Sequence, residues 1–231
     1  MPAQYNLLGT QNWLIKRILD DEVRRLISTY ARRVLLDIGC GVKPYQGFAL
    51  QYVDSYVGLD HENSPHSLSR VDIVSDAYDI PLDDSSVDCV LCTEVLEHLE
   101  EPATALKAAY RVLRPGGVAL YTVPFSWPVH EAPRDFYRYS EFGLKYLFEK
   151  AGFRIVEIRA LDGLLVKLIQ PMCYSLWQLR RGGFINPLWW LIPPITFLMQ
   201  ALAYYTNKHY RKDRNSPNTD HYSVVALKEV K

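Results

Sequence analysis

The stretch Val34-Leu35-Leu36-Asp37-Ile38-Gly39-Cys40-Gly41 decides the fold of this chain. A short apolar run ends in an acid and is followed by two glycines spaced by one residue. Such a run predicts a strand buried on both faces, as in a parallel sheet. Glycines directly after the strand permit a tight turn and let backbone N–H groups approach a ligand closely. The pattern therefore indicates a nucleotide-like ligand at the carboxyl edge of an open α/β sheet.

Strand and helix patterns alternate along the rest of the chain. The alternation predicts a mainly parallel sheet covered on both faces. The second expected strand ends at Asp60, about 20 residues after the glycine turn, where a ribose-binding carboxylate belongs. Expected strands cover residues 34–38, 55–60, 71–74, 87–92, 118–123, 153–160 and 222–227, and expected helices cover 13–30, 93–112 and 140–151.

Composition limits the classes of protein to consider. The 231 residues are enough for one α/β domain with one additional segment. Lys+Arg and Asp+Glu both total 26, and this balance argues against a dedicated nucleic-acid binder. The four cysteines lack a disulfide-framework spacing and the first residues lack a secretory pattern, so we expect a reducing, cytoplasmic compartment. Cys89 and Cys92 point to opposite faces of one strand, so we expect no shared metal.

Six motifs follow one another in the first two thirds of the chain: Asp37-Ile38-Gly39-Cys40-Gly41, Asp60, Asp76-Ala77, residues 81–88, Glu94-Val95-Leu96-Glu97-His98 and residues 112–117. In this order they resemble the motifs of class I S-adenosylmethionine-dependent methyltransferases, in particular the group called type 11. The resemblance implies an α/β, Rossmann-like, doubly wound sheet of seven strands, mostly parallel, with the last strand antiparallel. One position departs from the family pattern, because Lys43 stands where a third glycine is frequent.

The resemblance also implies which residues hold S-adenosylmethionine. Asp60 would accept both ribose hydroxyls, and Asp76 would accept from the adenine amine. The alternatives are a glycine turn without function and a solvated acid at a strand end. The full cofactor set implied is Asp37, Gly39, Cys40, Gly41, Asp60, Asp76, Ala77 and Thr93.

The substrate side is expected in the loop after the fifth strand, residues 124–139, which is crowded with proline, aromatic and ionisable residues. If the methyl acceptor is a hydroxyl, His130 is the best-matched base near neutral pH, with Glu131 as the alternative. Arginines here suit an anionic substrate group, although ion pairs that close the loop are an equal alternative. The expected substrate-binding residues are Trp127, Arg134, Tyr137 and Arg138.

We expect no metal site in this chain. Glu97 and His98 are adjacent on an expected helix, so they do not present two ligands on one helix face. Both residues are interpreted as groups on the helix surface.

A hydrophobic helical insertion, residues 161–218, separates the two parts of the expected methyltransferase domain, 1–160 and 219–231. Residues 182–207 contain no charged side chain, and Pro193-Pro194 is expected to interrupt them. A spanning helix needs roughly 20 unbroken apolar residues. The basic residues Arg180, Arg181, Lys208, Arg211, Lys212 and Arg214 flank both ends, which favours the same side of a membrane for both. We therefore predict a hairpin at the membrane surface, with a dimer interface or a lid over the substrate as alternatives.

These observations predict methyl transfer to a small or lipid-linked acceptor at a membrane face, by a cytoplasmic protein peripheral to the membrane. O-methylation of a glycan, polyprenyl or quinone-like substrate is favoured. One alternative is a soluble small-molecule methyltransferase that forms homodimers through its insertion. Another is an inactive subunit that binds the cofactor and scaffolds a partner.

Overall fold

The computed structural model describes residues 11–180, 185–210 and 218–230. The chain divides into two compact units, Met1–Glu22 with Ala160–Asp220, and Val23–Arg159 with His221–Lys231. Of the described residues, 11–22 therefore group with the insertion, whereas the sequence pattern assigned them to the methyltransferase domain. The expected basic flank residues Arg181, Arg211, Lys212 and Arg214 lie outside the described residues, as does the N-terminal segment 1–10.

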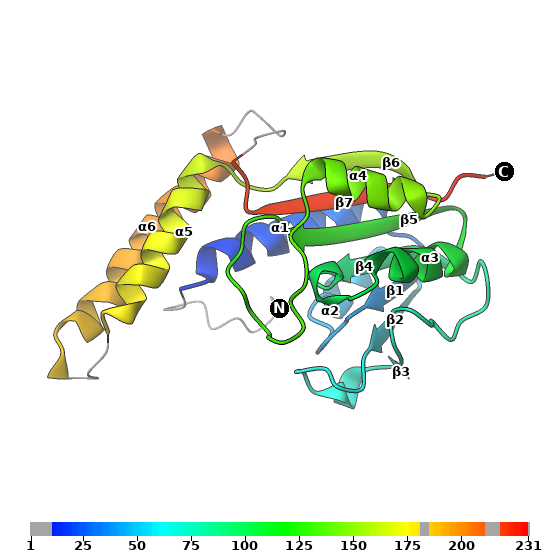
Figure 1. Ribbon diagram of the computed structural model, residues 1–231, viewed down its shortest axis with the longest axis horizontal. Helices are drawn as coiled ribbons and strands as arrows, with labels where there is room; N and C mark the ends of the chain where they lie inside the picture. Colours follow the sequence, from blue (N-terminus) through cyan, green and yellow to red (C-terminus); the bar gives the residue numbers. More distant parts are fainter. Residues whose placement is uncertain (1–10, 181–184, 211–217, 231) are drawn as a thin grey trace. The chain divides into compact units, whose positions relative to one another are not determined.

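The second unit is built on a seven-stranded sheet with the order β3-β2-β1-β4-β5-β7-β6 (Figure 1). Neighbouring strands from β3 to β5 pair in parallel, and β7 pairs antiparallel with β5. This arrangement confirms the predicted Rossmann-like fold. The strands are β1 (Val34–Ile38), β2 (Ser55–Asp60), β3 (Ile73–Val74), β4 (Val87–Thr93), β5 (Leu113–Pro124), β6 (Arg154–Ala160) and β7 (His221–Leu227).

Helices cover both faces of this sheet, α3 and α4 in front and the later part of α1 behind in Figure 1. On one face, Val23 and Ile27 of α1 (Trp13–Tyr30) pack in one core cluster with Leu35 and Leu91, which lie on β1 and β4. On the other face, Phe148 of α4 (Glu141–Lys150) meets the Tyr121 ring edge-on, with 5.1 Å between centroids. Side chains alternate between faces along each strand, so one strand serves both cores. The remaining helices of this unit are α2 (Gln46–Ala49), η1 (Leu68–Arg70), η2 (Leu96–His98) and α3 (Pro102–Val112).

The predicted helix over residues 93–112 is wrong in its first half. Strand β4 continues to Thr93, Glu94 takes a left-handed φ of 53°, and only the short 3-10 turn η2 precedes α3. Helix α3 begins at Pro102, which suits the first helical position because it has no N–H to leave unpaired. The segment between Thr93 and Pro102 is therefore free to bring side chains to the edge of the sheet.

The first unit contains a pair of helices, α5 (Leu164–Gln178) and α6 (Leu188–Tyr210). The expected interruption at Pro193-Pro194 is wrong, because α6 runs through both prolines. Packing against α5 accompanies this continuity: Trp177 Nε1 donates to Thr196 Oγ1 at 3.1 Å, one turn after the prolines. The Thr196 hydroxyl also donates to the carbonyl of Ile192 at 2.9 Å. Tertiary contacts here outweigh the local helix-breaking tendency of proline.

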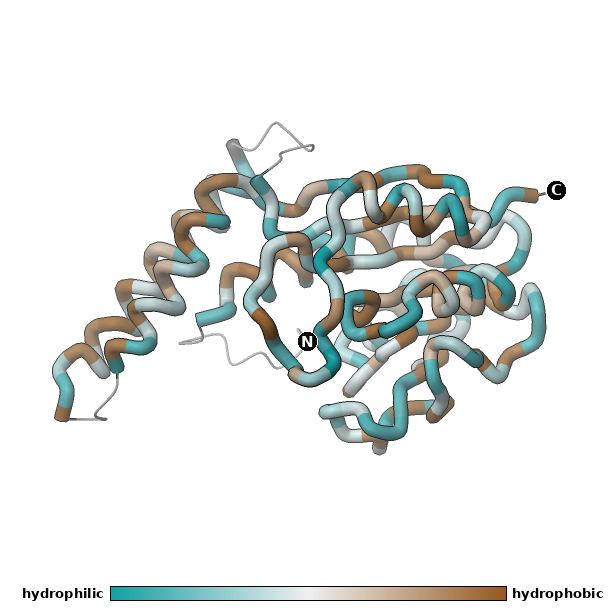
Figure 2. The backbone as a smooth tube through the Cα atoms, viewed as in Figure 1, coloured by the Kyte–Doolittle hydropathy of each residue, from teal (hydrophilic) through white to brown (hydrophobic). Residues whose placement is uncertain are grey.

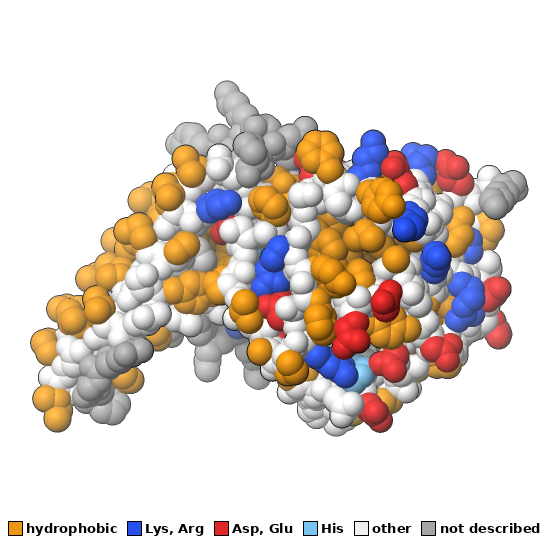
Figure 3. All heavy atoms as spheres, in the orientation of Figure 1, with side chains coloured by type: hydrophobic (Ala, Val, Ile, Leu, Met, Phe, Trp, Pro, Cys, Tyr) orange, Lys and Arg blue, Asp and Glu red, His pale blue; other side chains and the backbone are white. Residues whose placement is uncertain are grey.

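The helix pair carries an exposed apolar stripe, and hydrophobic residues recur along it in Figure 2 and cover it in Figure 3. The exposed residues of α6 recur at intervals of three and four, so they lie on one face. None of the helices in the described ranges is long and apolar enough to cross a membrane. The exposed large residues are Leu164, Leu165, Leu168 and Met172 on α5, and Leu188, Trp190, Leu191, Ile195, Leu198, Leu202 and Tyr205 on α6.

Candidate functional site

The turn after β1 requires glycine at two positions. Gly39 has a φ of 72° and Gly41 a φ of 51°, conformations that side chains with a Cβ rarely adopt. A Cβ on Gly39 would lie 2.3 Å from Cγ2 of Val95, and one on Gly41 would lie 3.1 Å from Cδ2 of His66. The turn therefore keeps its backbone accessible at the carboxyl edge of the sheet, where the sequence placed a ligand.

Asp60 ties the end of β2 to this turn. One carboxylate oxygen accepts the backbone N–H of Gly41 at 2.7 Å, and the other accepts that of His61 at 2.8 Å. The residue is buried, with 6% of its surface exposed. Each carboxylate oxygen has a second lone pair, so Asp60 retains acceptors for two hydroxyl groups of a ligand.

Asp37 lies at the end of β1 and is also buried. Its Oδ2 atom accepts the hydroxyl of Tyr56, whereas its Oδ1 atom has no hydrogen-bond partner among the described residues. Burial raises the pKa of Asp37 to about 7, and the Tyr56 hydrogen bond opposes this shift. Burial also raises the pKa of the Cys40 thiol to about 12, so Cys40 contributes packing and backbone rather than a reactive thiolate.

Lys43, the departure from the family pattern, has a structural explanation. Its φ is 55°, the conformation that explains the frequent glycine at this position in the family. The Lys43 side chain is buried and its ammonium forms an ion pair with Asp72, which also accepts the N–H of Gly58 at 2.7 Å. A Cβ on Gly58 would lie 2.3 Å from Cε of Lys43, so the lysine is accommodated by a glycine on the neighbouring strand.

The other expected cofactor residues lie on the same edge of the sheet. Asp76 follows β3 and lies 3.1 Å from Nε2 of His61, and Ala77 beside it is buried. Thr93 ends β4 and pairs with Thr122 of β5. Because the strands β1 to β4 are parallel, their carboxyl ends bring all these residues to one edge.

The loop after β5, residues 125–139, is the long connection that runs to α4 in Figure 1. Within it the guanidinium of Arg138 donates to both oxygens of Asp135, at 2.6 and 2.8 Å. Arg138 also donates to the carbonyls of Trp127, Pro128 and Tyr137. Arg138 thus has the arrangement of the ion-pair alternative, in which it closes the loop. Its hydrogen bond holds the pKa of Asp135 well below the usual range.

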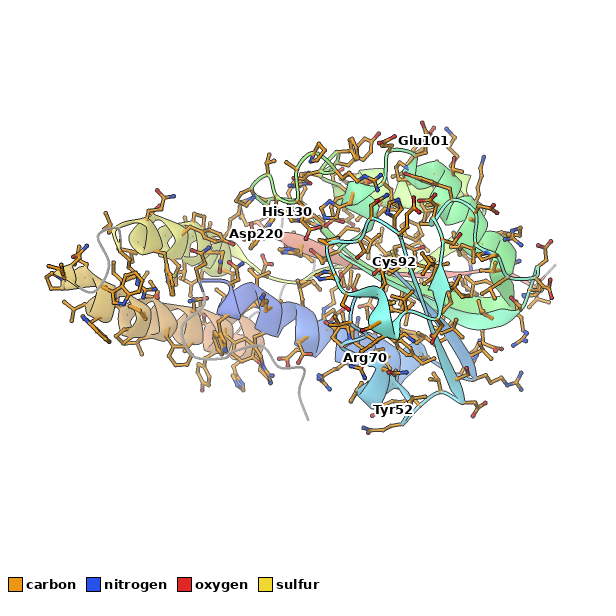
Figure 4. All side chains as sticks on the ribbon, turned by 90° about the horizontal axis from the view of Figure 1, so that it is seen from below. Tyr52, Arg70, Cys92, Glu101, His130 and Asp220 are labelled. Carbon is orange, nitrogen blue, oxygen red and sulfur yellow. The ribbon has the colours of Figure 1, made fainter. Side chains whose placement is uncertain are left out.

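His130 and Glu131 lie near the middle of this loop, and His130 is labelled in Figure 4. Asp135 Oδ2 accepts the backbone N–H of His130 at 2.9 Å and lies 3.4 Å from its Nδ1 atom. This contact directs the other ring nitrogen of His130 away from Asp135. Glu131 is exposed, and its φ is 51°.

The remaining expected substrate residues lie around the same loop. Arg134 is exposed, and its Nη1 atom lies 3.0 Å from Nε2 of His61. Trp127 packs edge-on against the ring of His221, with 5.2 Å between centroids. The Tyr137 hydroxyl donates to the carbonyl of Glu100 at 3.0 Å. Of the two arginines, Arg134 is the more accessible cation for an anionic ligand.

The interpretation of Glu97 and His98 as helix-surface groups is wrong. Glu97 is fully buried on η2, and His98 is mostly buried. Burial raises the pKa of Glu97 well above its usual range, and the nearby Glu94 carboxylate raises it further. Glu94 in turn lies 3.2 Å from Nε2 of His221. Two acids and a histidine lie close together in Glu94-Val95-Leu96-Glu97-His98, which could have indicated this cluster. The pattern was instead interpreted as the surface of a helix.

A family model described as "Methyltransferase domain" matches residues 36–121, the segment from β1 to β5 that forms this edge. This segment of the chain carries the methyltransferase domain of the class I S-adenosylmethionine-dependent enzymes. Within this class the match is to the type 11 group predicted from the motifs. The family assignment covers the glycine turn, Asp60, Asp76 and Thr93, whereas the loop with His130 lies beyond the matched segment.

Individual relatives agree with this assignment. A probable S-adenosylmethionine-dependent methyltransferase of Mycolicibacterium smegmatis is 33% identical over 145 residues, which cover 57% of this chain and 56% of that protein. A ubiquinone biosynthesis O-methyltransferase of Pseudomonas aeruginosa is 25% identical over 163 residues, 66% of this chain and 65% of that protein. The chain thus spans only about half to two thirds of the length of these methyltransferases.

Solved structures show the same fold. The crystal structure of an S-adenosylmethionine-dependent methyltransferase from Archaeoglobus fulgidus aligns with a TM-score of 0.58 at 19% identity. The alignment covers 92% of this chain and 94% of the other. At this identity the likeness establishes the fold alone.

Proposed function

We propose that this methyltransferase transfers the methyl group of S-adenosylmethionine to a hydroxyl of a small or lipid-linked acceptor. The observation that carries the proposal is the glycine turn held by Asp60, beside the buried Asp37 oxygen that lacks a partner among the described residues. Both features fit a nucleoside with a positively charged sulfonium. When bound, that cofactor supplies an electrophilic methyl group, so the residues of the chain act mainly by positioning the reactants.

In this proposal the cofactor residues have separate tasks. Gly39, Cys40 and Gly41 present backbone along the ligand, and Asp60 accepts the two ribose hydroxyls. Asp76 and Ala77 lie beside the adenine, and Thr93 borders the methyl-transfer site. Asp37 is held by the Tyr56 hydroxyl and, when ionised, contributes negative potential next to a cationic ligand.

His130 is the proposed base that removes the proton of the acceptor hydroxyl. Its support is the Asp135 carboxylate, which accepts the backbone N–H of His130 and, with Arg138, lies against its Nδ1 atom, so that the ring is held within the loop. Glu131 is the neighbouring alternative. Arg134 is the proposed partner of an anionic substrate group, and Trp127 and Tyr137 provide aromatic surface. Arg138 acts as a positioning residue through its bonds to Asp135.

The choice of a hydroxyl acceptor rests on a distant relative. The Pseudomonas aeruginosa protein is named as an O-methyltransferase of ubiquinone biosynthesis, and from this name we propose a lipid-linked hydroxyl acceptor for this chain. The exposed apolar stripe of α5 and α6 suits docking on a membrane surface where such an acceptor resides. The described cations at the ends of this helix pair, Arg180 and Lys208, suit anionic lipid headgroups.

A turnover assay tests the activity. The protein is incubated with S-adenosylmethionine and a panel of prenylated and unprenylated phenols, and S-adenosylhomocysteine is measured. We expect turnover with at least one phenol. Cofactor binding without turnover on the panel or on a lipid extract would favour the scaffold alternative.

Vesicle flotation tests the membrane part separately. Leu198→Glu combined with Leu202→Glu should abolish flotation with phosphatidylglycerol vesicles, because charge is placed on the apolar stripe. Phe142→Glu combined with Tyr146→Glu is the matched control, since both residues are exposed on α4. Equal flotation of the two variants would refute membrane docking through α6. A variant that changes only the oligomeric state would favour the dimer alternative.

A further inference from the structure

Three potential metal ligands converge at the carboxyl edge of the sheet. Glu97 and His98 come from η2, and His130 comes from the loop after β5. One ligand atom of each lies within 4.8 Å of the other two. Nε2 of His98 lies 3.7 Å from a carboxylate oxygen of Glu97 and 3.8 Å from one of Glu131. Glu97 and His98 are adjacent in the sequence, and the fold brings His130 to them from a distant segment.

The carboxyl group of Glu97 is buried, so it is either protonated or paired with a cation. The residue has no exposed surface, and neither carboxylate oxygen has a hydrogen-bond partner among the described residues. A buried carboxylate without hydrogen bonds or a counter-charge costs several kcal/mol. Its backbone is fixed as well, because the carbonyl of Glu97 accepts the N–H groups of Phe136 and Tyr137 at 2.9 and 3.2 Å. The side chain is therefore held at this position in spite of the cost.

Each histidine places one ring nitrogen near the other ligand atoms, and polar groups hold both rings. Nδ1 of His98 contacts the carbonyl oxygen of Arg134, which assigns the ring proton to Nδ1 and leaves Nε2 as an acceptor facing Glu97. Nδ1 of His130 lies 3.4 Å from the Asp135 carboxylate and 3.5 Å from Nη2 of Arg138, and these two groups hold the ring. A backbone carbonyl or carboxylate behind each imidazole is the usual support of metal-binding histidines.

We propose that Glu97, His98 and His130 bind a divalent transition-metal ion, with one coordination position open. Two imidazoles and a carboxylate suit Zn²⁺ or a similar ion rather than Mg²⁺ or Ca²⁺, which prefer oxygen ligands throughout. Two ligands about 2.1 Å from a tetrahedral ion lie roughly 3.4 Å apart. The 3.7 Å between His98 and Glu97 is close to this separation and too long for a hydrogen bond between them.

The surrounding charges favour a cation. The carboxylates of Glu94 and Glu131 lie near Glu97 and His98, respectively. Arg138 is a positive charge near Glu97, and both oxygens of Asp135 already accept from its guanidinium. An ion at this position would balance an otherwise acidic cluster.

The inference rests on this geometry and does not require methyl transfer. It does bear on the proposed role of His130, because an imidazole nitrogen that binds a metal has no lone pair for a proton. In the loaded protein the open coordination position would lie beside the proposed acceptor site, where a hydroxyl can bind. The two roles of His130 are therefore exclusive within one molecule.

Metal titration of the full chain tests the inference without cofactor or acceptor. After removal of bound metal with a chelator, calorimetry with Zn²⁺ alone should show one ion per chain with a dissociation constant in the micromolar range or below. Co²⁺ should give the visible absorption of a site with nitrogen and oxygen ligands. Glu97→Gln should weaken Zn²⁺ binding at least tenfold, whereas His209→Ala, a histidine on the exposed surface of α6, should leave it unchanged.

His130→Ala is the second variant. The His130 side chain is less buried than that of Glu97, so its removal should disturb folding less than a change at Glu97. Circular dichroism establishes that each variant is folded. If folded His130→Ala binds Zn²⁺ at least tenfold more weakly than the unaltered protein, the site is supported. Absence of stoichiometric Zn²⁺ binding by the unaltered protein, or undiminished binding by both variants, would overturn it and leave Glu97 as a protonated structural acid.

Discussion

Asp60 accepts the backbone N–H of Gly41 at 2.7 Å and so joins the end of β2 to the turn after β1. The two residues are 19 positions apart in the chain, and their strands are adjacent and parallel. The same carboxylate thus orders the turn and presents lone pairs at its edge. Substitutions in the turn or at the end of β2 should therefore lower both the stability of the turn and the affinity for the cofactor.

Gly39→Ala should destabilise the protein by about 1–3 kcal/mol, because a φ of 72° is strained for any residue with a Cβ. The added Cβ would also meet Val95 at 2.3 Å. Urea unfolding measures the effect. Gly47→Ala is the control, since a Cβ there meets nothing within 4 Å and Gly47 lies in helix α2. Equal stability of Gly39→Ala and the unaltered protein would contradict the described turn.

Asp37 should make stability depend on pH. Its pKa is about 7 in the folded protein and near 3.8 ordinarily, so between these values the folded state holds a proton that the unfolded state releases. Stability should therefore fall as pH rises from about 4 to about 7, by roughly 4 kcal/mol at most. Asp37→Asn should remove this component, and the difference between the two unfolding curves isolates it from other groups. Parallel curves would show that Asp37 has an ordinary pKa.

Lys43 and Gly58 should be energetically coupled. Gly58→Ala introduces a Cβ 2.3 Å from Cε of Lys43 and is expected to cost about 1–3 kcal/mol. Lys43→Ala removes that contact and the ion pair with Asp72. The double variant should therefore lose less stability than the sum of the single variants, by at least about 0.5 kcal/mol. Strict additivity in a double-mutant cycle would mean that the two side chains do not meet.

Asp135→Ala should loosen the loop after β5. The carboxylate is 2% exposed and accepts from Arg138 and from the backbone of His130, so its removal is expected to cost about 1.5–3 kcal/mol. Glu149→Ala is the control, because its ion pair with Lys145 is exposed and should be worth less than about 0.5 kcal/mol. Thermal unfolding compares the two. A similar small loss in both would assign Asp135 no role in closing the loop.

The local sequence pattern was sufficient to predict the sheet and the glycine turn. Apolar runs that end in an acid mark β1 and β2 directly, and Ser140 before α4 is a side-chain cap, since its Oγ accepts the N–H of Gly143. The carboxyl-edge positions of Asp37, Asp60 and Asp76 follow from strand direction alone. These features depend on neighbours in the chain or on one rule of topology.

The missed features depend on contacts between distant segments. The continuity of α6 through Pro193-Pro194 accompanies packing against Trp177 of α5, which no local pattern reveals. The burial of Glu97 follows from the loop that contains His130 and Tyr137 folding onto η2. The role of Lys43 depends on a glycine in β2 and an acid before β3. In each case a tertiary partner decides what the residue does.

The most direct test of the account is calorimetric titration of S-adenosylmethionine into the unaltered protein, Asp60→Asn and Asp54→Asn. Asp54 is an exposed acid close to the start of β2. Asp54→Asn therefore removes the same charge as Asp60→Asn but leaves the turn unaltered. We expect one cofactor per chain, at least a tenfold loss of affinity (about 1.4 kcal/mol) for Asp60→Asn, and no loss for Asp54→Asn. Equal affinity of all three folded proteins would contradict it.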